Sequence, residues 1–263
     1  MGAHQIARGL SGIANGLIYL FILSPILVII PSSFSSTAVL YFWPEGYSLR
    51  WYRHFFETPE LVGSLWLSLE LALAATAIAS ALGVPAALAI ARHRFPGRDW
   101  LAAFFLAPMV VPGLVLGIAF LLLFSKTVLA GSFWALLIAH IVIILPYVIR
   151  TVTGTLYGLD PMLEQAAIGL GARPVVAFWT ITLPLLKSGI LAGAVLAFVT
   201  SFDELVVSAF LTGPQLTPLP VQIYTYIEFT SDPTIAAVSV LLVLFTALAM
   251  LLTERVVGFG QIV

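Results

Sequence analysis

Six long apolar runs are the feature that most constrains what this chain can fold into. A hydrocarbon layer about 30 Å thick requires about 20 apolar residues in helical form. Runs near that length occur at residues 13–30, 65–91, 101–124, 133–149, 188–210 and 234–253. They are continuous and do not alternate, which excludes a transmembrane β-barrel. The sequence therefore predicts an all-α, polytopic membrane protein with six transmembrane helices.

Composition supports this class and excludes others. Of 263 residues, 61% are hydrophobic and only 9% are charged, whereas soluble domains have about 25% charged residues. The net charge of −1 provides no basic segment for nucleic acid. The chain has no cysteine, which excludes disulfides and thiolate metal sites. The first apolar run is longer than a signal-peptide core and lacks a small-residue cleavage site, so we expect it to be retained.

Basic residues assign the orientation. With the amino terminus inside, eight of the eleven Lys and Arg residues are cytoplasmic: Arg8, Arg92, Arg94, Arg98, Arg150, Arg173, Lys187 and Arg255. Short cytoplasmic loops carry the excess of basic residues in membrane proteins, so both termini are expected in the cytoplasm. The expected domains are an amino-terminal helix with an external loop (1–60), a five-helix core (61–255) and a short cytoplasmic tail (256–263).

The longest cytoplasmic segment, residues 157–185, contains its own helix signals. Asp160 is able to cap a helix start, and Glu164 near that end suits the helix dipole. Gly171 is able to take a positive φ and turn the chain. Arg173-Pro174 then opens a second helical stretch. We expect two short helices joined at the glycine, with a small apolar exposed side that suits burial against another protein: Leu163, Ala166, Ala167 and Leu170.

The spacing of this segment resembles the cytoplasmic EAA loop of bacterial ABC importer permeases, in which EAA, three residues, G, nine residues and I-x-L-P follow in order. Here Gln165-Ala166-Ala167, Gly171 and Ile181-Thr182-Leu183-Pro184 match every gap, although the pattern's glutamate is Gln165 and Glu164 stands beside it. The resemblance implies a type I importer permease fold and a coupling helix, at about residues 159–171, that docks in an ATPase groove. The residues expected to couple are Asp160, Leu163, Glu164, Gln165, Ala166, Ala167, Gly171, Arg173, Leu183 and Pro184.

Longer phrases resemble the second permease of spermidine/putrescine-type importers, including "MVVPGLVLGIAF", "LAFVTSFDELVVSAFLTGP" and "TPLPVQIYTYI". This resemblance implies a non-catalytic subunit of the bacterial inner membrane with no cofactor of its own. The implied partners are a second, usually different permease, two ATPase copies that bind ATP and Mg, and an extracytoplasmic solute-binding protein. The implied substrate is a polyamine-like cation, with an opine, 4-aminobutyrate or another amino-acid-like solute as the alternative.

Three carboxylates within the apolar runs are candidates for the substrate pathway. Glu70, Asp203 and Glu204 are expected at similar depths near the external mouth, where carboxylates would favour a cation. Charged groups inside spans cost about 2.5–3.5 kcal/mol on insertion scales and are therefore functional candidates. Asp203 and Glu204 would point about 100° apart on one helix, so at most one of them is expected to face the pathway, and the alternative for the other is a hydrogen bond to a neighbouring helix or a place in the interface. The alternative for Glu70 is the headgroup zone.

Other features indicate architecture. Pro108 and Pro112 are expected to kink the third span and Pro146 the fourth. His140, a lone histidine mid-span, is expected to be packed or hydrogen-bonded. A stripe of small residues predicts close helix packing, within this subunit or against a second permease: Ala75, Ala79, Gly83 and Ala87.

Motifs of other function classes are absent from the sequence. There is no G-x-x-x-x-G-K-[ST] phosphate loop, no G-x-S-x-G elbow and no H-E-x-x-H pair, so neither ATP hydrolysis nor a hydrolase or metal site is expected. An ion-gradient-driven secondary transporter is the competing class. It would be expected to show two related halves or a midplane ionisable pair, and the sequence shows no clear internal repeat.

Overall fold

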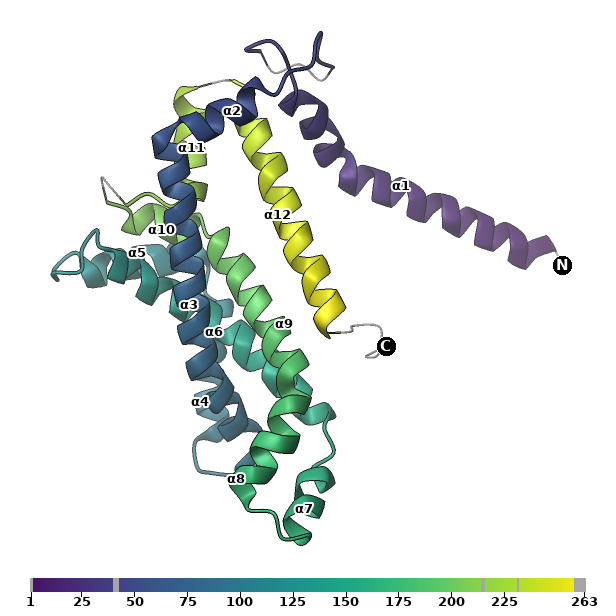
Figure 1. Ribbon diagram of the computed structural model, residues 1–263, viewed down its shortest axis with the longest axis vertical. Coiled ribbons are helices and arrows are strands. Elements are labelled where there is room, and N and C mark those ends of the chain that lie inside the picture. Colours follow the sequence, from purple (N-terminus) through teal and green to yellow (C-terminus); the bar gives the residue numbers. More distant parts are fainter. Residues whose placement is uncertain (1, 40–42, 214–215, 231, 258–263) are drawn as a thin grey trace. The chain divides into compact units, whose positions relative to one another are not determined.

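The computed structural model describes residues 2–39, 43–213, 216–230 and 232–257, and this part of the chain consists of helices and connecting turns (Figure 1). The predicted tail 256–263 lies outside the described residues after Val257. In chain order the helices are α1 (Gly2–Ser33), α2 (Arg50–Glu57), α3 (Pro59–Arg92), α4 (Arg98–Leu106), the 3₁₀-helix η1 (Ala107–Met109), α5 (Gly113–Phe124), α6 (Phe133–Gly158), α7 (Met162–Gly169), α8 (Pro174–Ala177), the π-helix η2 (Phe178–Thr182), α9 (Leu183–Phe202), α10 (Val206–Leu211), α11 (Leu219–Phe229) and α12 (Thr234–Val257).

The all-α prediction is confirmed, and the apolar runs coincide with the long helices. Five helical segments of the described residues are long and apolar enough to cross a membrane, and a bent helix pair supplies a sixth. Several of these helices extend beyond their apolar runs. The helix of the fourth apolar run, α6, continues from Phe133 to Gly158. It ends nine residues past its apolar run, because the polar residues that follow the run also adopt helical geometry.

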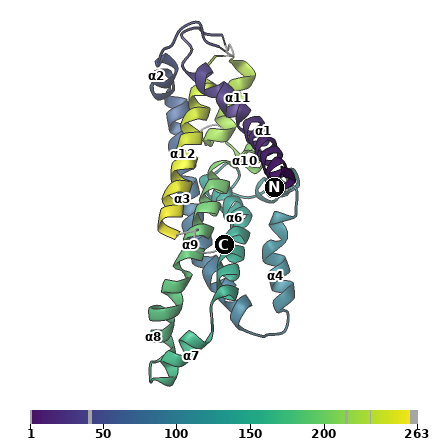
Figure 2. The same cartoon turned by 90° about the vertical axis from the view of Figure 1, so that its right-hand side faces the viewer.

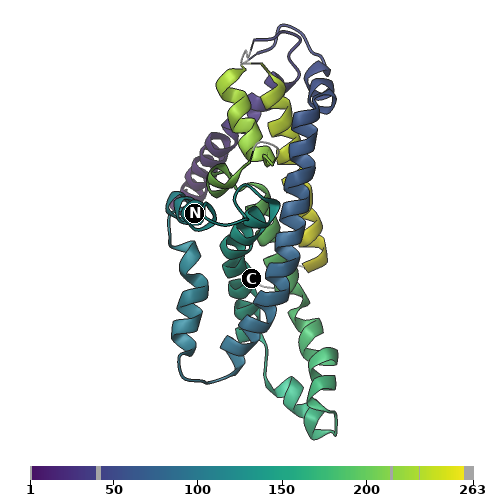
Figure 3. The same cartoon turned by 90° about the vertical axis from the view of Figure 1, so that its left-hand side faces the viewer.

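The third span is broken, whereas the sequence predicts only a kink. Residues Arg98–Met109 and Gly113–Phe124 form two helical pieces bent by 99° (Figure 3). Pro112 has extended ψ (135°) as the N-cap of α5, and proline cannot donate a hydrogen bond to the preceding turn. The break therefore falls where two prolines, four residues apart, remove backbone donors.

The fifth span also differs from the prediction of one helix over residues 188–210. Its helix begins at Pro174, runs without interruption through the π-turn of η2, and ends at Phe202. Residues 203–205 are not helical, and α10 begins at Val206. Residues 157–185 therefore contain α7 and, as predicted, a second helical stretch that opens at Pro174, and this second stretch passes directly into α9.

The chain divides into two compact units. The first comprises residues 1–62 and 223–245. Within it, Trp51 is buried and its indole Nε1 donates to the Ser35 carbonyl at 2.8 Å. The Tyr52 and Ser33 hydroxyls hydrogen-bond at 2.7 Å. These bonds fasten α2 to the turn that follows α1.

The second unit, residues 63–222 and 246–263, contains most of α3 and all of α4 to α10. Its core joins α6 to α3, α9 and α10, and α6 and α9 lie side by side (Figures 1 and 2). The small-residue stripe faces α6: Ala75, Ala79 and Ala87 are fully buried, and a Cβ added to Gly83 would lie 2.9 Å from Val148 Cγ1. This confirms that the stripe packs within the subunit.

Candidate coupling site and acidic helix break

The short helix α7 is closed at both ends by local hydrogen bonds. At its start, Asp160 Oδ1 accepts from the Met162 N–H at 2.9 Å, although the N-cap position itself is taken by Pro161, one residue after Asp160. At its end, Gly171 has φ = +96°, as predicted. The Ala172 N–H bonds to the Ala167 carbonyl at 3.0 Å and the Gly171 N–H to the Ile168 carbonyl at 2.9 Å, the two bonds of a Schellman motif. Gly171 therefore terminates α7 and sets the direction of the next segment.

The residues after the turn lead directly into the fifth span. Arg173 is exposed and takes the N-cap position of α8, with Pro174 at the first helical position. Leu183 and Pro184 occupy the first turn of α9, where the π-turn precedes them. Proline is tolerated there because its missing N–H is replaced by local changes in the hydrogen-bond pattern. The IxLP part of the motif thus marks the change from π- to α-geometry.

Helix α7 and its C-cap residue, Leu170, carry exposed apolar side chains. Leu163 is 49% exposed and Leu170 is 91% exposed. Ala166 is also exposed, whereas Ala167 is half-buried. A cluster of this kind at the tip of a cytoplasmic segment is typical of a protein-binding surface. Three of the four residues predicted to form an exposed apolar side are therefore exposed, and the fourth, Ala167, is half-buried.

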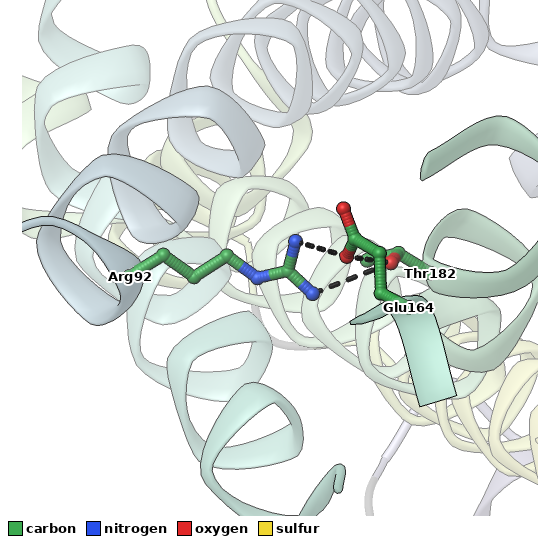
Figure 4. A network of polar contacts seen from close by, with 3 residues as sticks. All are labelled: Arg92, Glu164 and Thr182. Atoms are coloured by element: carbon green, nitrogen blue, oxygen red, sulfur yellow. Dashed lines mark hydrogen bonds and ion pairs between the residues drawn. The ribbon is translucent and has the colours of Figure 1, made fainter. Parts of the chain in front are cut away.

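A polar network connects α7 to two transmembrane helices (Figure 4). Arg92, the last residue of α3, donates from Nη1 to Glu164 Oε2 at 2.6 Å, forming an ion pair. The same carboxylate oxygen accepts from Thr182 Oγ1 at 2.5 Å. Arg92 Nη2 also lies 3.3 Å from Thr182 Oγ1. One carboxylate of α7 therefore bonds to α3 and to the end of η2, which continues into α9.

The electrostatics of Glu164 follow from these contacts. The hydrogen bond from Thr182 and the adjacent Arg92 guanidinium stabilise the carboxylate and hold the pKa of Glu164 below its usual value, against the opposing effect of burial. The side chain of Glu164 is 19% exposed and that of Arg92 is 32% exposed. Partial burial protects this pair from complete screening by water and salt. Glu164 is thus ionised in its folded environment.

Gln165, the residue at the motif's glutamate position, takes no part in the network. It is exposed and lines a pocket of ≈ 490 Å³ formed by the ends of α3 and α6 with α7. The ion pair at this site is made by Glu164, one residue earlier. The sequence places Glu164 beside the motif but does not reveal its partners, because Arg92 lies 72 residues from Glu164 and 90 residues from Thr182 along the chain.

The two acids of the fifth span lie at the break between α9 and α10. Asp203 is the C-cap residue of α9. Glu204 Oε1 accepts from the Val207 N–H at 2.9 Å, and so satisfies a backbone donor in the first turn of α10. Asp203 is exposed and Glu204 is half-buried. Among the described residues, none forms a hydrogen bond or ion pair with the Asp203 carboxylate. Glu204 therefore caps α10, whereas the Asp203 carboxylate is left without a partner among the described residues.

Glu70 lies apart from this pair as far as the contacts of the described residues go. It is exposed on α3, and no hydrogen bond or ion pair within the described part of the chain joins it to Asp203 or Glu204. Two residues earlier, Ser68 Oγ accepts from the Leu219 N–H at 2.8 Å. The shared depth of the three carboxylates stays a prediction.

Sequence reasoning missed two participants in the coupling network, Arg92 and Thr182. Arg92 counted only toward the cytoplasmic charge bias, and Thr182 occupies the variable position of I-x-L-P. The one signal in the sequence is Thr182 itself, a polar side chain between two apolar motif positions. In the structure this side chain is only 2% exposed.

Comparisons with known proteins agree with this geometry. Residues 79–258 match the family model described as "Binding-protein-dependent transport system inner membrane component". The chain belongs to this family. The permease is 32% identical over 254 residues to the spermidine/putrescine transport system permease protein PotC of Escherichia coli K12, a match that covers 97% of this chain and 96% of PotC. It is 33% identical to the putrescine transport system permease protein PotI of the same strain, covering 85% and 82% of the two chains.

One relative is named for a different substrate. The permease is 34% identical to the molybdenum transport system permease protein ModB of Mycobacterium bovis over 225 residues, covering 80% of this chain and 82% of ModB. Identity at this level therefore shows the family without selecting one solute.

Solved structures show the same fold at low sequence identity. A chain of a bacterial ABC transporter that imports the acidic polysaccharide alginate superposes with a TM-score of 0.72 at 16% identity, covering 98% of this chain and 97% of that chain. A chain of the MetNI methionine ABC transporter superposes with a TM-score of 0.64 at 20% identity, covering 75% and 94%. The permease therefore has the type I ABC importer permease fold.

Proposed function

We propose that this permease is the membrane subunit of an ATP-driven importer that moves a polyamine-like organic cation into the cell by alternating access. Membership of the inner-membrane permease family is the starting point. The observation that carries the proposal is the bonding of α7 to both α3 and η2 through the Glu164 carboxylate. A protein docked on the exposed apolar surface of α7 can move two spans together through this carboxylate.

The transmission follows from the connectivity of the site. When the ATPase shifts α7, Glu164 pulls on Arg92 at the end of α3 and on Thr182 at the end of η2. Because a helix is stiff along its axis, η2 and α9 would carry the displacement over the 20 residues of α9, about 30 Å. It would reach residues 203–205 between α9 and α10, which we call the acidic break because they include Asp203 and Glu204. Coupling requires two discrete arrangements of such packed helices. The nucleotide state of the ATPase would select between outward and inward access.

Charge at the break favours a cation. The free Asp203 carboxylate lies at the carboxyl end of α9, where the helix dipole is also negative. Both features attract a positive amine, in keeping with the names of the polyamine relatives. An opine or another amino-acid-like solute would require in addition a group that binds a carboxylate. No contact of the described residues supplies such a group at Asp203.

The partners follow from the mechanism. The permease would pair with a second permease, usually a different chain in this subgroup, and with two ATPase copies. These copies hold ATP and Mg, while this chain contributes no covalent chemistry. An extracytoplasmic binding protein would deliver the substrate.

Reconstituted importer tests this proposal. Uptake of radiolabelled spermidine by vesicles containing the full complex should require ATP inside and should fall by about tenfold or more in D203N, with the complex still assembled. E57Q serves as the matched control, because Glu57 is an exposed carboxylate at the end of α2, outside the apolar runs. Uptake that continues without ATP and follows an imposed ion gradient would support the secondary-transporter class and contradict the proposal. Unchanged uptake in D203N would remove Asp203 from the pathway.

A further inference from the structure

His140 makes two buried hydrogen bonds within the second unit. Its side chain, on α6, is only 1% exposed. Its ring Nδ1 lies 2.8 Å from Ser201 Oγ, and its Nε2 lies 3.0 Å from Ser208 Oγ. Both serines are buried as well. A neutral imidazole has one donor and one acceptor nitrogen, and a hydroxyl can serve as either partner, so both hydrogen bonds form in either tautomer.

The two serines lie on opposite sides of the acidic break. Ser201 belongs to the last turn of α9, and Ser208 belongs to α10. In an unbroken helix, residues seven apart are separated by about 10 Å along the axis. Here one imidazole joins both ends of the interrupted segment. The ends of α9 and α10 are therefore fixed relative to α6 by a single side chain.

The break that His140 spans carries the free carboxylate. Asp203 follows Ser201 by two residues, and its backbone N–H still bonds to the Val199 carbonyl at 3.1 Å. Beyond the break, α10 packs against α5: a Cβ on Gly117 would lie 2.5 Å from the Phe210 ring. Since α10 is held by α5 and by Ser208, and α9 by Ser201, little freedom is left for the residues between them.

We propose that His140 is a positioning residue that holds the ends of α9 and α10 so that the Asp203 carboxylate faces the substrate pathway. This role rests on the proposed function of Asp203. Among the described residues, Ser201 and Ser208 are its hydrogen-bond partners, and loss of either would release the end of α9 or the end of α10.

Cysteine reactivity measures this positioning without reference to the substrate. The chain contains no cysteine, so D203C is the only thiol of the permease. In the assembled importer, the rate of its modification by 2-(trimethylammonium)ethyl methanethiosulfonate is followed by mass spectrometry of this chain. Adding H140A should lower that rate by about tenfold. Without the imidazole, the ends of α9 and α10 are no longer held, and the side chain at position 203 turns away from the substrate pathway. S201A or S208A should give intermediate rates.

A matched control separates positioning from general damage to α6. Thr153 lies on the same helix, and its buried hydroxyl has no hydrogen-bond partner among the described residues, so T153V should leave the rate unchanged. With Asp203 restored, H140A should raise the KM for spermidine uptake more than it lowers kcat. A purely structural role would instead lower the amount of assembled importer and leave KM unchanged.

The outcomes distinguish this inference from the proposed function. Modification rates within about twofold of the parent in H140A, S201A and S208A would overturn the positioning role. If H140A does not assemble, the two serine variants decide the question alone. Normal spermidine uptake by D203N would contradict the proposed pathway, whereas the cysteine rates would still report whether His140 fixes the break.

Discussion

At the scale of single residues, Glu164 connects α7, the short helix that ends at the Gly171 turn, to the membrane spans α3 and α9. A motif comparison alone would leave the permease without its glutamate, since Gln165 occupies that position. The structure shows that the neighbouring carboxylate bonds to Arg92 and Thr182. The shift by one residue turns the carboxylate toward α3 and leaves the glutamine exposed.

Replacing Glu164 should weaken coupling selectively. E164Q removes the ion pair and keeps the side-chain volume, at a cost of roughly 1 kcal/mol for this partly exposed pair. We expect ATP hydrolysis stimulated by the binding protein to fall by roughly fivefold, with basal hydrolysis retained. E254Q is the matched control and should leave stimulation unchanged, because Glu254 is an exposed carboxylate of α12 outside the coupling segment. The role fails if the two variants behave alike.

The ionisation of Glu164 gives a second residue-scale prediction. Its pKa is lowered on folding by Thr182 and Arg92. The stability it contributes is therefore present above the pKa of the unfolded chain and is lost as the pH falls through the lower pKa of the folded state. T182V removes the largest cause and should raise the pKa of Glu164, as measured by NMR of the carboxyl carbon. A pKa that does not rise would show that Thr182 does not donate to Glu164.

At the scale of elements, the turn after α7 depends on one backbone conformation. Gly171 has φ = +96°, and an added Cβ would meet nothing within 4 Å. A substitution there is penalised by backbone conformation alone. G171A should destabilise the turn after α7 by about 1–2 kcal/mol and lower the thermal unfolding temperature of the complex.

Gly169, the last residue of α7, is the control for that prediction. Its added Cβ also meets nothing within 4 Å, and its φ is not positive. G169A should leave the unfolding temperature unchanged or slightly raised, since alanine favours helix more than glycine. Equal losses in G169A and G171A would contradict the importance of the positive φ.

The breaks in the third and fifth spans show what sequence reasoning could reach. The apolar runs predicted every long helix, because desolvation of the backbone requires helices across a membrane. The break after Met109 could be predicted only in part, from two prolines. The break at residues 203–205 has no proline or glycine to signal it. It is supported by a local cap, the Glu204 bond to the Val207 N–H, and by two tertiary contacts, the bonds of His140 to Ser201 and Ser208.

The site residues also fall into two groups, those whose roles could be predicted from the sequence and those whose roles could not. Gly171 and Asp160 act through neighbours in the chain, so their roles could be predicted from spacing. Arg92 and Thr182 act through a carboxylate many residues away. Their participation depends on the packing of α3, α7 and α9, which no local pattern encodes.

At the scale of the whole molecule, α9 joins two sites of the second unit. Thr182 of the coupling network precedes its first residue, and Ser201 and Asp203 lie at its other end. Under the proposed function, a displacement of α7 would be passed along α9 to residues 203–205, where the Asp203 carboxylate lies. In the proposed mechanism, this continuous helix links ATP hydrolysis on one side of the membrane to access of a cation on the other.

Disulfide or bifunctional crosslinking from α7 tests the central claim most directly. Leu170 is 91% exposed at the end of α7, and Val128, between α5 and α6 on the predicted external side, is 98% exposed. In this cysteine-free chain, L170C should capture the ATPase within the purified importer, with a yield that changes between the ATP-bound and nucleotide-free states. V128C should capture none. Failure of L170C to capture the ATPase, or equal capture by both variants, would contradict the account.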